Sequence, residues 1–215
     1  MDLSKLHDAI IRGNARESEA LTKEAIAAGL DPMSVVNGTL IPAMEVVGAL
    51  FQRNEYYIPE MLISARAMKT SLALLKPLIA ASGQAGSATR VVIGTVQGDL
   101  HDIGKNLVGM MLEGAGYEIV DLGTDVTAEQ FVNGVREHGA KVVCLSALLT
   151  TTMTGMKGII ESLQSAGLRD KVYVMIGGAP VTDRFAKQIG ADGYAADAAS
   201  AADLLKGRVL SSATS

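Results

Sequence analysis

The chain has 215 residues, of which 48% are hydrophobic and 20% charged, with a net charge of -4 at pH 7. This composition favours a packed core in one large or two small domains and excludes a disordered chain. The lack of a basic surplus argues against nucleic acid as a partner, and the single cysteine excludes an internal disulfide. We expect a soluble, cytoplasmic protein without membrane contact, because the first ten residues contain no apolar leader and the longest charge-free run, 142–156, is too short to cross a bilayer.

The first part of the chain shows helical periodicity and no strand-like run. Asn14 is a predicted N-cap for a helix that ends at Gly29, and Asp31 with Pro32 begins another that runs toward Phe51, bent near Gly38 or Pro42. The predicted helices are 3–12, 15–28, 32–51 and 60–81. Four helices with short connections indicate a small bundle, and the small polar residues at 82–89 indicate a linker.

From residue 90 onward, apolar runs alternate with amphipathic stretches. The predicted strands are 90–95, 117–121, 142–146, 172–176 and 193–196. The predicted helices are 104–114, 128–138, 152–166, 183–189 and 198–206. This alternation predicts a flavodoxin-like, doubly wound parallel sheet of five strands, in which the first and third strands are neighbours. Ligands bind such sheets beyond the carboxyl ends of the strands, so the loops there are the candidate site.

The loop after the first predicted strand is rich in glycine but differs from a phosphate loop. Five residues rather than four separate Gly98 from Gly104, and Asn106 stands where a magnesium-binding Ser or Thr would be. The loop offers instead an imidazole, His101, with a carboxylate two residues before it, Asp99. A histidine that binds a metal usually donates its second ring N–H to an oxygen acceptor, and Asp99 is the candidate.

One imidazole is too few for a zinc site built by the protein, which needs about four ligands. We therefore interpret His101 as the axial ligand of a metal that a macrocycle already holds in its plane. The alternative is that His101 caps the following helix and that Asp99 bonds its own backbone in a turn.

Two further loops belong to the same predicted edge of the sheet. The loop after the third strand is rich in hydroxyls, and the loop after the fourth begins with two glycines. Together the three loops resemble the D-x-H-x-x-G, S-x-L and G-G signature of cobalamin-binding domains, carried here by Asp99, His101 and Gly104, by Ser146 and Leu148, and by Gly177 and Gly178.

The first part of the chain resembles the helical cap that precedes this domain in methionine synthase, through residues 44–51, 57–61 and 64–68. The whole layout is similar to stand-alone corrinoid proteins of methylotrophic methanogens and acetogenic O-demethylases. The resemblance implies a helical cap domain at 1–84 and a cobalamin-binding, Rossmann-like domain at 90–215.

The resemblance also implies roles for single residues. His101 would ligate cobalt in place of the base of the cofactor, Asp99 would hydrogen-bond His101, and Thr152 would complete this relay where the family often has serine. Other implied cofactor contacts are Asp102, Gly104, Ser146, Leu148, Thr150, Gly177, Gly178 and Ala198, with Phe51 and Ile58 of the cap over the upper, methyl-bearing face.

Plainer interpretations stand beside these roles. Asp102 is explained as a charge at a helix N-terminus, and the threonines at 150–152 as N-cap residues. Phe51 and Ile58 would be core residues in any bundle. Lys105 and Asn106 are expected on the surface of an early helix turn, and Cys144 is expected to be an inert core thiol.

The resemblance implies a methyl carrier rather than a complete enzyme. Such a protein binds cobalamin, receives a methyl group from a substrate-specific methyltransferase and passes it to a second methyltransferase whose acceptor is tetrahydrofolate or coenzyme M. A reductive activase is a further expected partner. The alternatives are a cobalamin-dependent sensor and the small subunit of a cobalamin mutase. The methyl donor (methylamine, methanol, a methoxylated aromatic or betaine) is left open.

Overall fold

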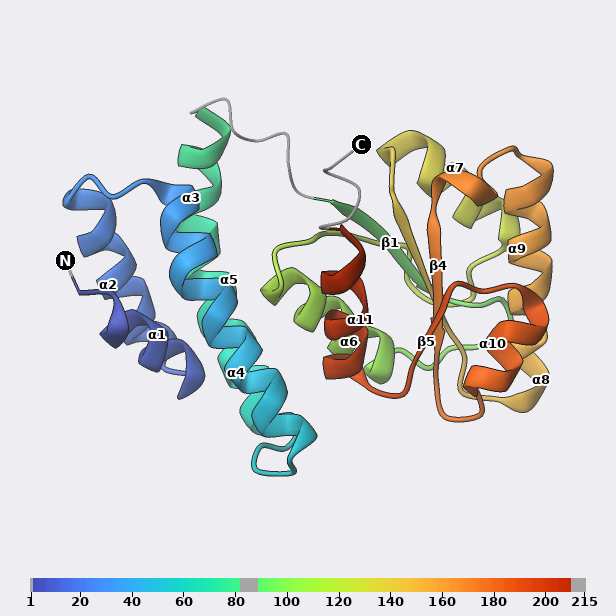
Figure 1. Ribbon diagram of the computed structural model, residues 1–215, viewed down its shortest axis with the longest axis horizontal. Helices are drawn as coiled ribbons and strands as arrows, with labels where there is room; N and C mark the ends of the chain where they lie inside the picture. Colours follow the sequence, from blue (N-terminus) through green and yellow to red (C-terminus); the bar gives the residue numbers. More distant parts are fainter. Residues whose placement is uncertain (1, 82–88, 210–215) are drawn as a thin grey trace. The chain divides into compact units, whose positions relative to one another are not determined.

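The computed structural model describes residues 2–81 and 89–209, which form two compact units (Figure 1). One unit consists of the helices before residue 82 together with residues 113–116, and the other of the remaining described residues. The predicted linker at 82–89 lies outside the described residues except for Thr89. The two units are described separately.

The first unit is a helical bundle. Its helices are α1 (Ser4–Ile11), α2 (Ala15–Ala27), α3 (Pro32–Val35), α4 (Ile41–Gln52) and α5 (Ile58–Ala81), with a π-helical segment, η1 (Val36–Leu40), between α3 and α4. The predicted N-caps are confirmed: the Asn14 side chain accepts from Glu17 N–H, and that of Asp31 accepts from Ser34 N–H. Where a bend was expected near Gly38 and Pro42, the chain widens into the π-helical segment instead of breaking.

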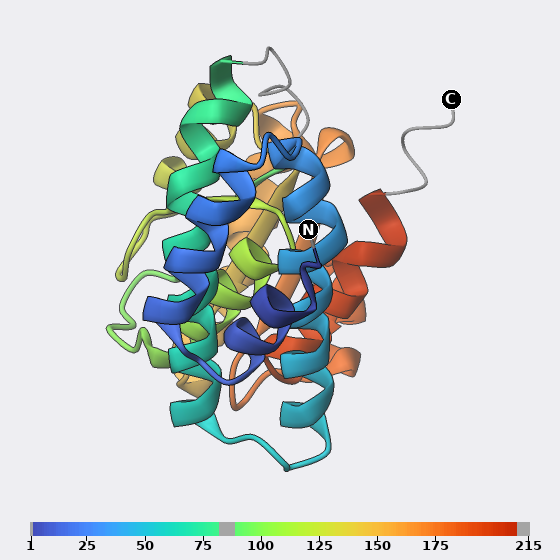
Figure 2. The same cartoon turned by 90° about the vertical axis from the view of Figure 1, so that its left-hand side faces the viewer.

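The bundle is held by apolar side chains and by a close approach of two helices. Helix α2 packs against α5, and α1 packs against α2 and α4 (Figure 2). Between α2 and α5 the buried Thr22 hydroxyl donates to the Ser71 hydroxyl at 2.9 Å. Among the residues that the structure describes, one helical run, Pro32–Gln52, is long and apolar enough to cross a membrane, and 44% of its most apolar stretch is buried inside the protein.

The second unit is a five-stranded parallel sheet in the order β2-β1-β3-β4-β5. The strands are β1 (Arg90–Thr95), β2 (Glu118–Asp121), β3 (Val142–Ser146), β4 (Tyr173–Gly177) and β5 (Gly193–Ala195). The register pairs Ile93 with Cys144 and Thr95 with Ser146, so β1 and β3 end side by side. This confirms the predicted flavodoxin-like order and the neighbouring first and third strands.

Helices cover both faces of this sheet. They are α6 (Ile103–Gly114), α7 (Ala128–His138), α8 (Thr150–Met153), α9 (Gly155–Ser165), α10 (Asp183–Ile189) and α11 (Ala198–Val209). Figure 1 shows α6 and α11 on one face and α7, α9 and α10 on the other. The predicted helix 152–166 is in fact two, α8 and α9, separated at Thr154, where clustered threonines and a glycine weaken helix propensity.

The core of this unit explains the strand sequences. Alternate residues of β1, β3 and β4, such as Val92, Val143 and Val174, pack against Phe131 of α7 and Leu163 of α9 in one buried cluster. Strands covered on both faces become continuous apolar runs, which is the pattern found in the sequence. Cys144 is buried within β3, and burial raises the pKa of its thiol to about 12, so the expectation of an inert core thiol is confirmed.

Candidate functional site

The site begins at the carboxyl end of β1, where the chain turns away from the sheet before α6. Val96 N–H donates to Ser146 O at 3.0 Å, which keeps this turn beside the end of β3. The Thr95 hydroxyl, buried at the end of β1, donates to His101 O at 2.8 Å. The loop that carries His101 is therefore folded back onto the strand from which it starts.

Asp99 is the centre of the hydrogen-bonding network. Asp99 is only 1% exposed, and both of its carboxylate oxygens accept hydrogen bonds. Oδ1 accepts from His101 N at 3.1 Å and lies 2.7 Å from His101 Nδ1. Oδ2 accepts from Leu148 N at 2.8 Å and from the Thr152 hydroxyl at 2.7 Å. The carboxylate thus joins the loop after β1 to the loop after β3.

These hydrogen bonds decide the charge of Asp99. Burial raises the pKa of the Asp99 carboxyl, but hydrogen bonds from Leu148 N–H, from the Thr152 hydroxyl and from His101 outweigh burial and hold this pKa well below its ordinary value. Asp99 is therefore ionised at neutral pH and can only accept hydrogen bonds.

The ionised carboxylate fixes the state of His101. Because Asp99 Oδ1 has no proton to give, the proton between the two side chains belongs to His101 Nδ1. In the neutral ring this leaves a lone pair on Nε2, the nitrogen that can bind a metal. The imidazole is 52% exposed, so it is fixed at one nitrogen and remains accessible.

Apolar side chains on the same loop flank the imidazole in the sequence. Leu100 is 74% exposed and Ile103 is 71% exposed, and Leu148 and Leu149 of the loop after β3 are also exposed. Exposed apolar residues next to an accessible imidazole in the sequence are suited to cover the apolar surface of a ligand. Sequence reasoning did not single out Leu100, Ile103 and Leu149 as exposed apolar residues; the available signal was that apolar residues interrupt otherwise polar loops.

The structure gives the predicted contacts in the loops after β1 and β3 different surroundings. Ser146 is half-buried at the end of β3, and Thr150 is exposed at the start of α8. Asp102 is exposed and accepts from Asn106 N–H at 2.8 Å through its carbonyl, with its carboxylate 3.1 Å from Asn106 Nδ2, as expected of a helix N-terminus. Gly104 faces open space, since a Cβ there would meet nothing within 4 Å.

The two glycines after β4 have an explanation within the protein itself. Gly178 has φ +124°, and a Cβ there would lie 1.8 Å from Ala147 O. A Cβ on Gly177 would lie 3.0 Å from Ala195 O. The close approach of Ala147 requires glycine at Gly178, and the Ala195 carbonyl of the neighbouring strand leaves little room for a side chain at Gly177. Ala198, at the start of α11, is buried.

The two predicted contacts in the cap lie in the helical unit. Phe51 is half-buried near the end of α4. Ile58 begins α5 and is 43% exposed, so the interpretation of Ile58 as a core residue is wrong. Exposed apolar side chains also include Tyr57, Leu62 and Ile63, and the cap therefore presents an apolar surface at this end of α5.

Lys105 differs from its expected place on the surface. The residue is 3% exposed, and its Nζ lies 2.5 and 2.6 Å from the two carboxylate oxygens of Asp121, at the end of β2. Asn106 Oδ1 accepts from the same ammonium at 2.8 Å. A lysine can be buried at this cost in hydration only because its charge is paired and hydrogen-bonded. The ion pair fixes the first turn of α6, directly after the His101 loop.

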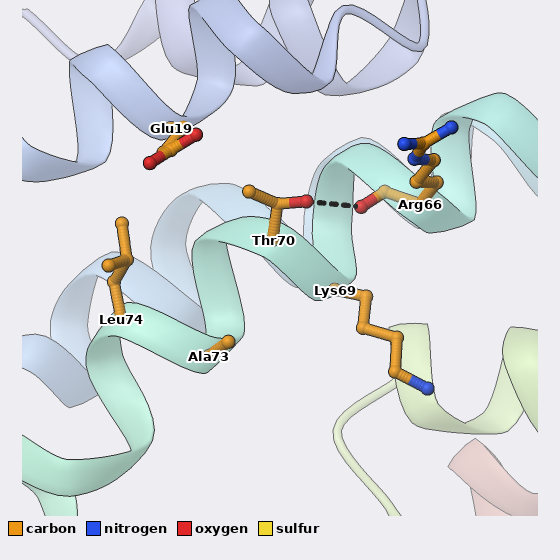
Figure 3. A pocket seen from close by; sticks show the side chains of 6 residues that line it. All are labelled: Glu19, Arg66, Lys69, Thr70, Ala73 and Leu74. Atoms are coloured by element: carbon orange, nitrogen blue, oxygen red, sulfur yellow. Dashed lines mark hydrogen bonds between the residues drawn. The ribbon is translucent and has the colours of Figure 1, made fainter.

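A hollow of about 440 Å³ lies in the helical unit between α2 and α5 (Figure 3), and none of the residues that line it is a predicted site residue. It is lined by Glu19, Arg66, Lys69, Thr70, Ala73 and Leu74. None of the described residues forms a group of three or more His, Cys, Asp or Glu side chains able to hold a metal ion.

Thr152 is expected to stabilise the Asp99 network through its hydroxyl alone. Replacing Thr152 with valine keeps the branched shape but leaves Asp99 Oδ2 without the 2.7 Å hydrogen bond. We expect the free energy of unfolding of the protein without cofactor to fall by about 1–2 kcal/mol. Thr152→Ser keeps the hydroxyl and serves as the control. Urea unfolding measures both variants, and equal losses in the two would remove the hydroxyl from the network.

Comparisons with known proteins find matches to both parts of the chain. Family models described as B12 binding domains match residues 89–203 and residues 3–76. A corrinoid protein of Desulfitobacterium hafniense is 44% identical, covering 94% of each chain. A dimethylamine corrinoid protein of Methanosarcina barkeri is 42% identical, covering 93% of each. One chain of the methanol:cobalamin methyltransferase complex of Methanosarcina barkeri has a similar structure, with a TM-score of 0.81 at 30% identity. The match covers 96% of this chain and 78% of the chain in the complex.

Proposed function

Since this chain belongs to the family of B12-binding corrinoid proteins, we propose that it carries methyl groups between two methyltransferases, with His101 as the lower ligand of cobalt. The observation that carries this proposal is the pair formed by Asp99 and His101. A fully buried, ionised carboxylate holds Nδ1 of an accessible imidazole at 2.7 Å and leaves Nε2 for the metal.

The protein itself would position the metal ligand, hold the proton on its second ring nitrogen and provide apolar surface for the cofactor. Bound cobalamin supplies a cobalt ion that takes up and releases the methyl group. Asp99 holds the proton on His101 Nδ1 and would leave the lone pair of Nε2 free for the metal. Leu100 and Ile103, both exposed and within two residues of His101 in the sequence, would offer apolar surface that a bound cofactor could cover and so shelter from water.

The predicted contacts Asp102, Gly104, Ser146, Leu148, Thr150, Gly177, Gly178 and Ala198 remain part of the proposal for the lower side of the cofactor. Leu148 has the strongest support, because its N–H binds Asp99 while its side chain stays exposed. For the upper side we keep Phe51 and Ile58, and the exposure of Ile58 supports a surface role.

A methyl carrier does not itself cleave the bond that holds the methyl group of the substrate, so it needs enzymes as partners. One relative forms part of a methanol:cobalamin methyltransferase complex, which supports a substrate-specific methyltransferase as the first partner here. We further propose a second methyltransferase with tetrahydrofolate or coenzyme M as acceptor, a reductive activase, and a cytoplasmic location. The substrate-specific methyltransferase, rather than this chain, would select the methyl donor.

Reconstitution tests the proposal. The purified chain is incubated with cobalamin, passed through a gel-filtration column, and reduced; radiolabelled methanol or dimethylamine is then added with a methyltransferase that acts on it. We expect coloured protein that becomes labelled with at least one donor, and no label on the protein without cobalamin. A colourless protein would contradict cofactor binding. Coloured protein that accepts label from neither donor would exclude these two donors, and the same failure with a methoxylated aromatic and betaine would favour a sensor.

A further inference from the structure

The turn between β2 and α7 holds the His101 loop from the side opposite to β3. Asp125 lies in this turn, and its Oδ1 accepts from Gly98 N–H at 2.7 Å. Its own N–H donates to Asp99 O at 3.0 Å. Asp125 thus binds the backbone of two successive residues of the loop, one of which is the carboxylate residue that orients His101.

The sheet brings Asp125 to this place. The pairing of β1 with β2 is interrupted after Asp121 and resumes in an isolated parallel bridge between Val96 and Val126. Val126 N–H donates to Thr95 O at 2.9 Å, which fixes the residue after Asp125 to the end of β1. The turn therefore has a defined register against the His101 loop, although 27 residues separate Gly98 from Asp125.

The backbone conformation of Asp125 favours a residue that tolerates positive φ, and aspartate adds a hydrogen-bond acceptor there. Asp125 has φ +55°, a left-handed conformation that glycine adopts at no steric cost and that other residues adopt less readily. Aspartate and asparagine tolerate this conformation better than most, and they add an acceptor that glycine lacks. Here that acceptor is used, since it binds the N–H of Gly98, itself left-handed at φ +82°.

We propose that Asp125 is a positioning residue for the metal ligand: by holding Gly98 and Asp99, it keeps the imidazole of His101 beneath the cobalt. This inference rests on the proposed function. The loop is held on one side by the bonds from Leu148 and Thr152 to the Asp99 carboxylate, and on the other by Asp125. Without the Asp125 carboxylate, Gly98 N–H is released although Asp125 N–H still holds Asp99 O, so the backbone before Asp99 can move and shift His101.

Two substitutions separate the side-chain acceptor from the backbone conformation. Asp125→Gly keeps the left-handed conformation and removes the acceptor, whereas Asp125→Asn keeps both. In the protein without cofactor, we expect the Gly98 amide to exchange with solvent about ten-fold faster in Asp125→Gly, the factor that corresponds to loss of one hydrogen bond to a carboxylate. Asp125→Asn should exchange at close to the wild-type rate.

The same variants are then loaded with cobalamin and reduced to cobalt(II) for electron paramagnetic resonance. We expect the fraction of the signal that shows nitrogen hyperfine splitting to fall in Asp125→Gly and to be restored in Asp125→Asn. Equal fractions in all three proteins would overturn the positioning role, even if the Gly98 amide exchanges faster. Absence of splitting in the wild type would instead defeat the proposed function, so the two failures are distinguishable.

Discussion

Replacing His101 with alanine is expected to abolish the nitrogen hyperfine splitting of the cobalt(II) signal completely while leaving the fold intact. The side chain is half exposed, and its contacts with the rest of the network run through Nδ1. Alanine keeps both backbone bonds of the residue, from its N–H to Asp99 and from the Thr95 hydroxyl to its carbonyl. We therefore expect a loss of only about 1 kcal/mol in the free energy of unfolding.

His138→Ala is the matched control for this variant. His138 is an exposed imidazole at the end of α7, and the bond that Arg90 donates to this residue ends on its backbone carbonyl, which alanine keeps. The control should show full splitting. If His101→Ala kept a splitting that comes from a protein nitrogen rather than from the cofactor's own base, the assignment of His101 would be wrong.

Replacing Asp99 with alanine is expected to destabilise the protein without cofactor by about 3 kcal/mol, the largest effect on folding among the variants considered. The change leaves Leu148 N–H, the Thr152 hydroxyl and His101 Nδ1 without their buried acceptor. Each buried donor left unpaired costs roughly 1–3 kcal/mol, reduced where water enters. Urea unfolding at neutral pH gives the difference, and a loss below that of Thr152→Val would contradict the central role of Asp99.

The same carboxylate gives stability a defined dependence on pH. Folding lowers the pKa of Asp99, so its contribution is fully present above the ordinary aspartate value of about 3.9 and is lost as pH falls from there toward the folded pKa. Asp99→Asn cannot titrate at this position. We expect the difference in unfolding free energy between wild type and Asp99→Asn to shrink below about pH 4. A difference that stays constant would show that the pKa of Asp99 is not lowered by folding.

The fold was predictable because its signals are local. Buried parallel strands read as short apolar runs, and two helical starts could be read from side chains next to the first turn, at Asn14 and Asp31. The break between α8 and α9 at Thr154 was missed because helical periodicity continues on both sides of it. Periodicity reports which face is buried and is insensitive to a single interrupted turn.

The site, like the fold, was predictable where its contacts are local in the sequence. Asp99 and His101 are two residues apart, so their contact could be inferred from the sequence, and the family resemblance added Thr152 from the loop after β3. The buried position of Lys105 was not predicted because its partner, Asp121, lies 16 residues away at the end of β2. The contact of Asp125 with Gly98 depends on how β1 and β2 pair beyond their ends, which no local pattern encodes.

The central claim is that a nitrogen of His101 binds the metal, and isotope labelling tests it most directly. The wild-type protein is produced with histidine carrying the heavy nitrogen isotope, loaded with cobalamin and reduced to cobalt(II). We predict that each line, a triplet with ordinary nitrogen, becomes a doublet with labelled histidine. A triplet that persists after labelling would mean that the ligand comes from the cofactor's own base, and it would contradict the role assigned to His101.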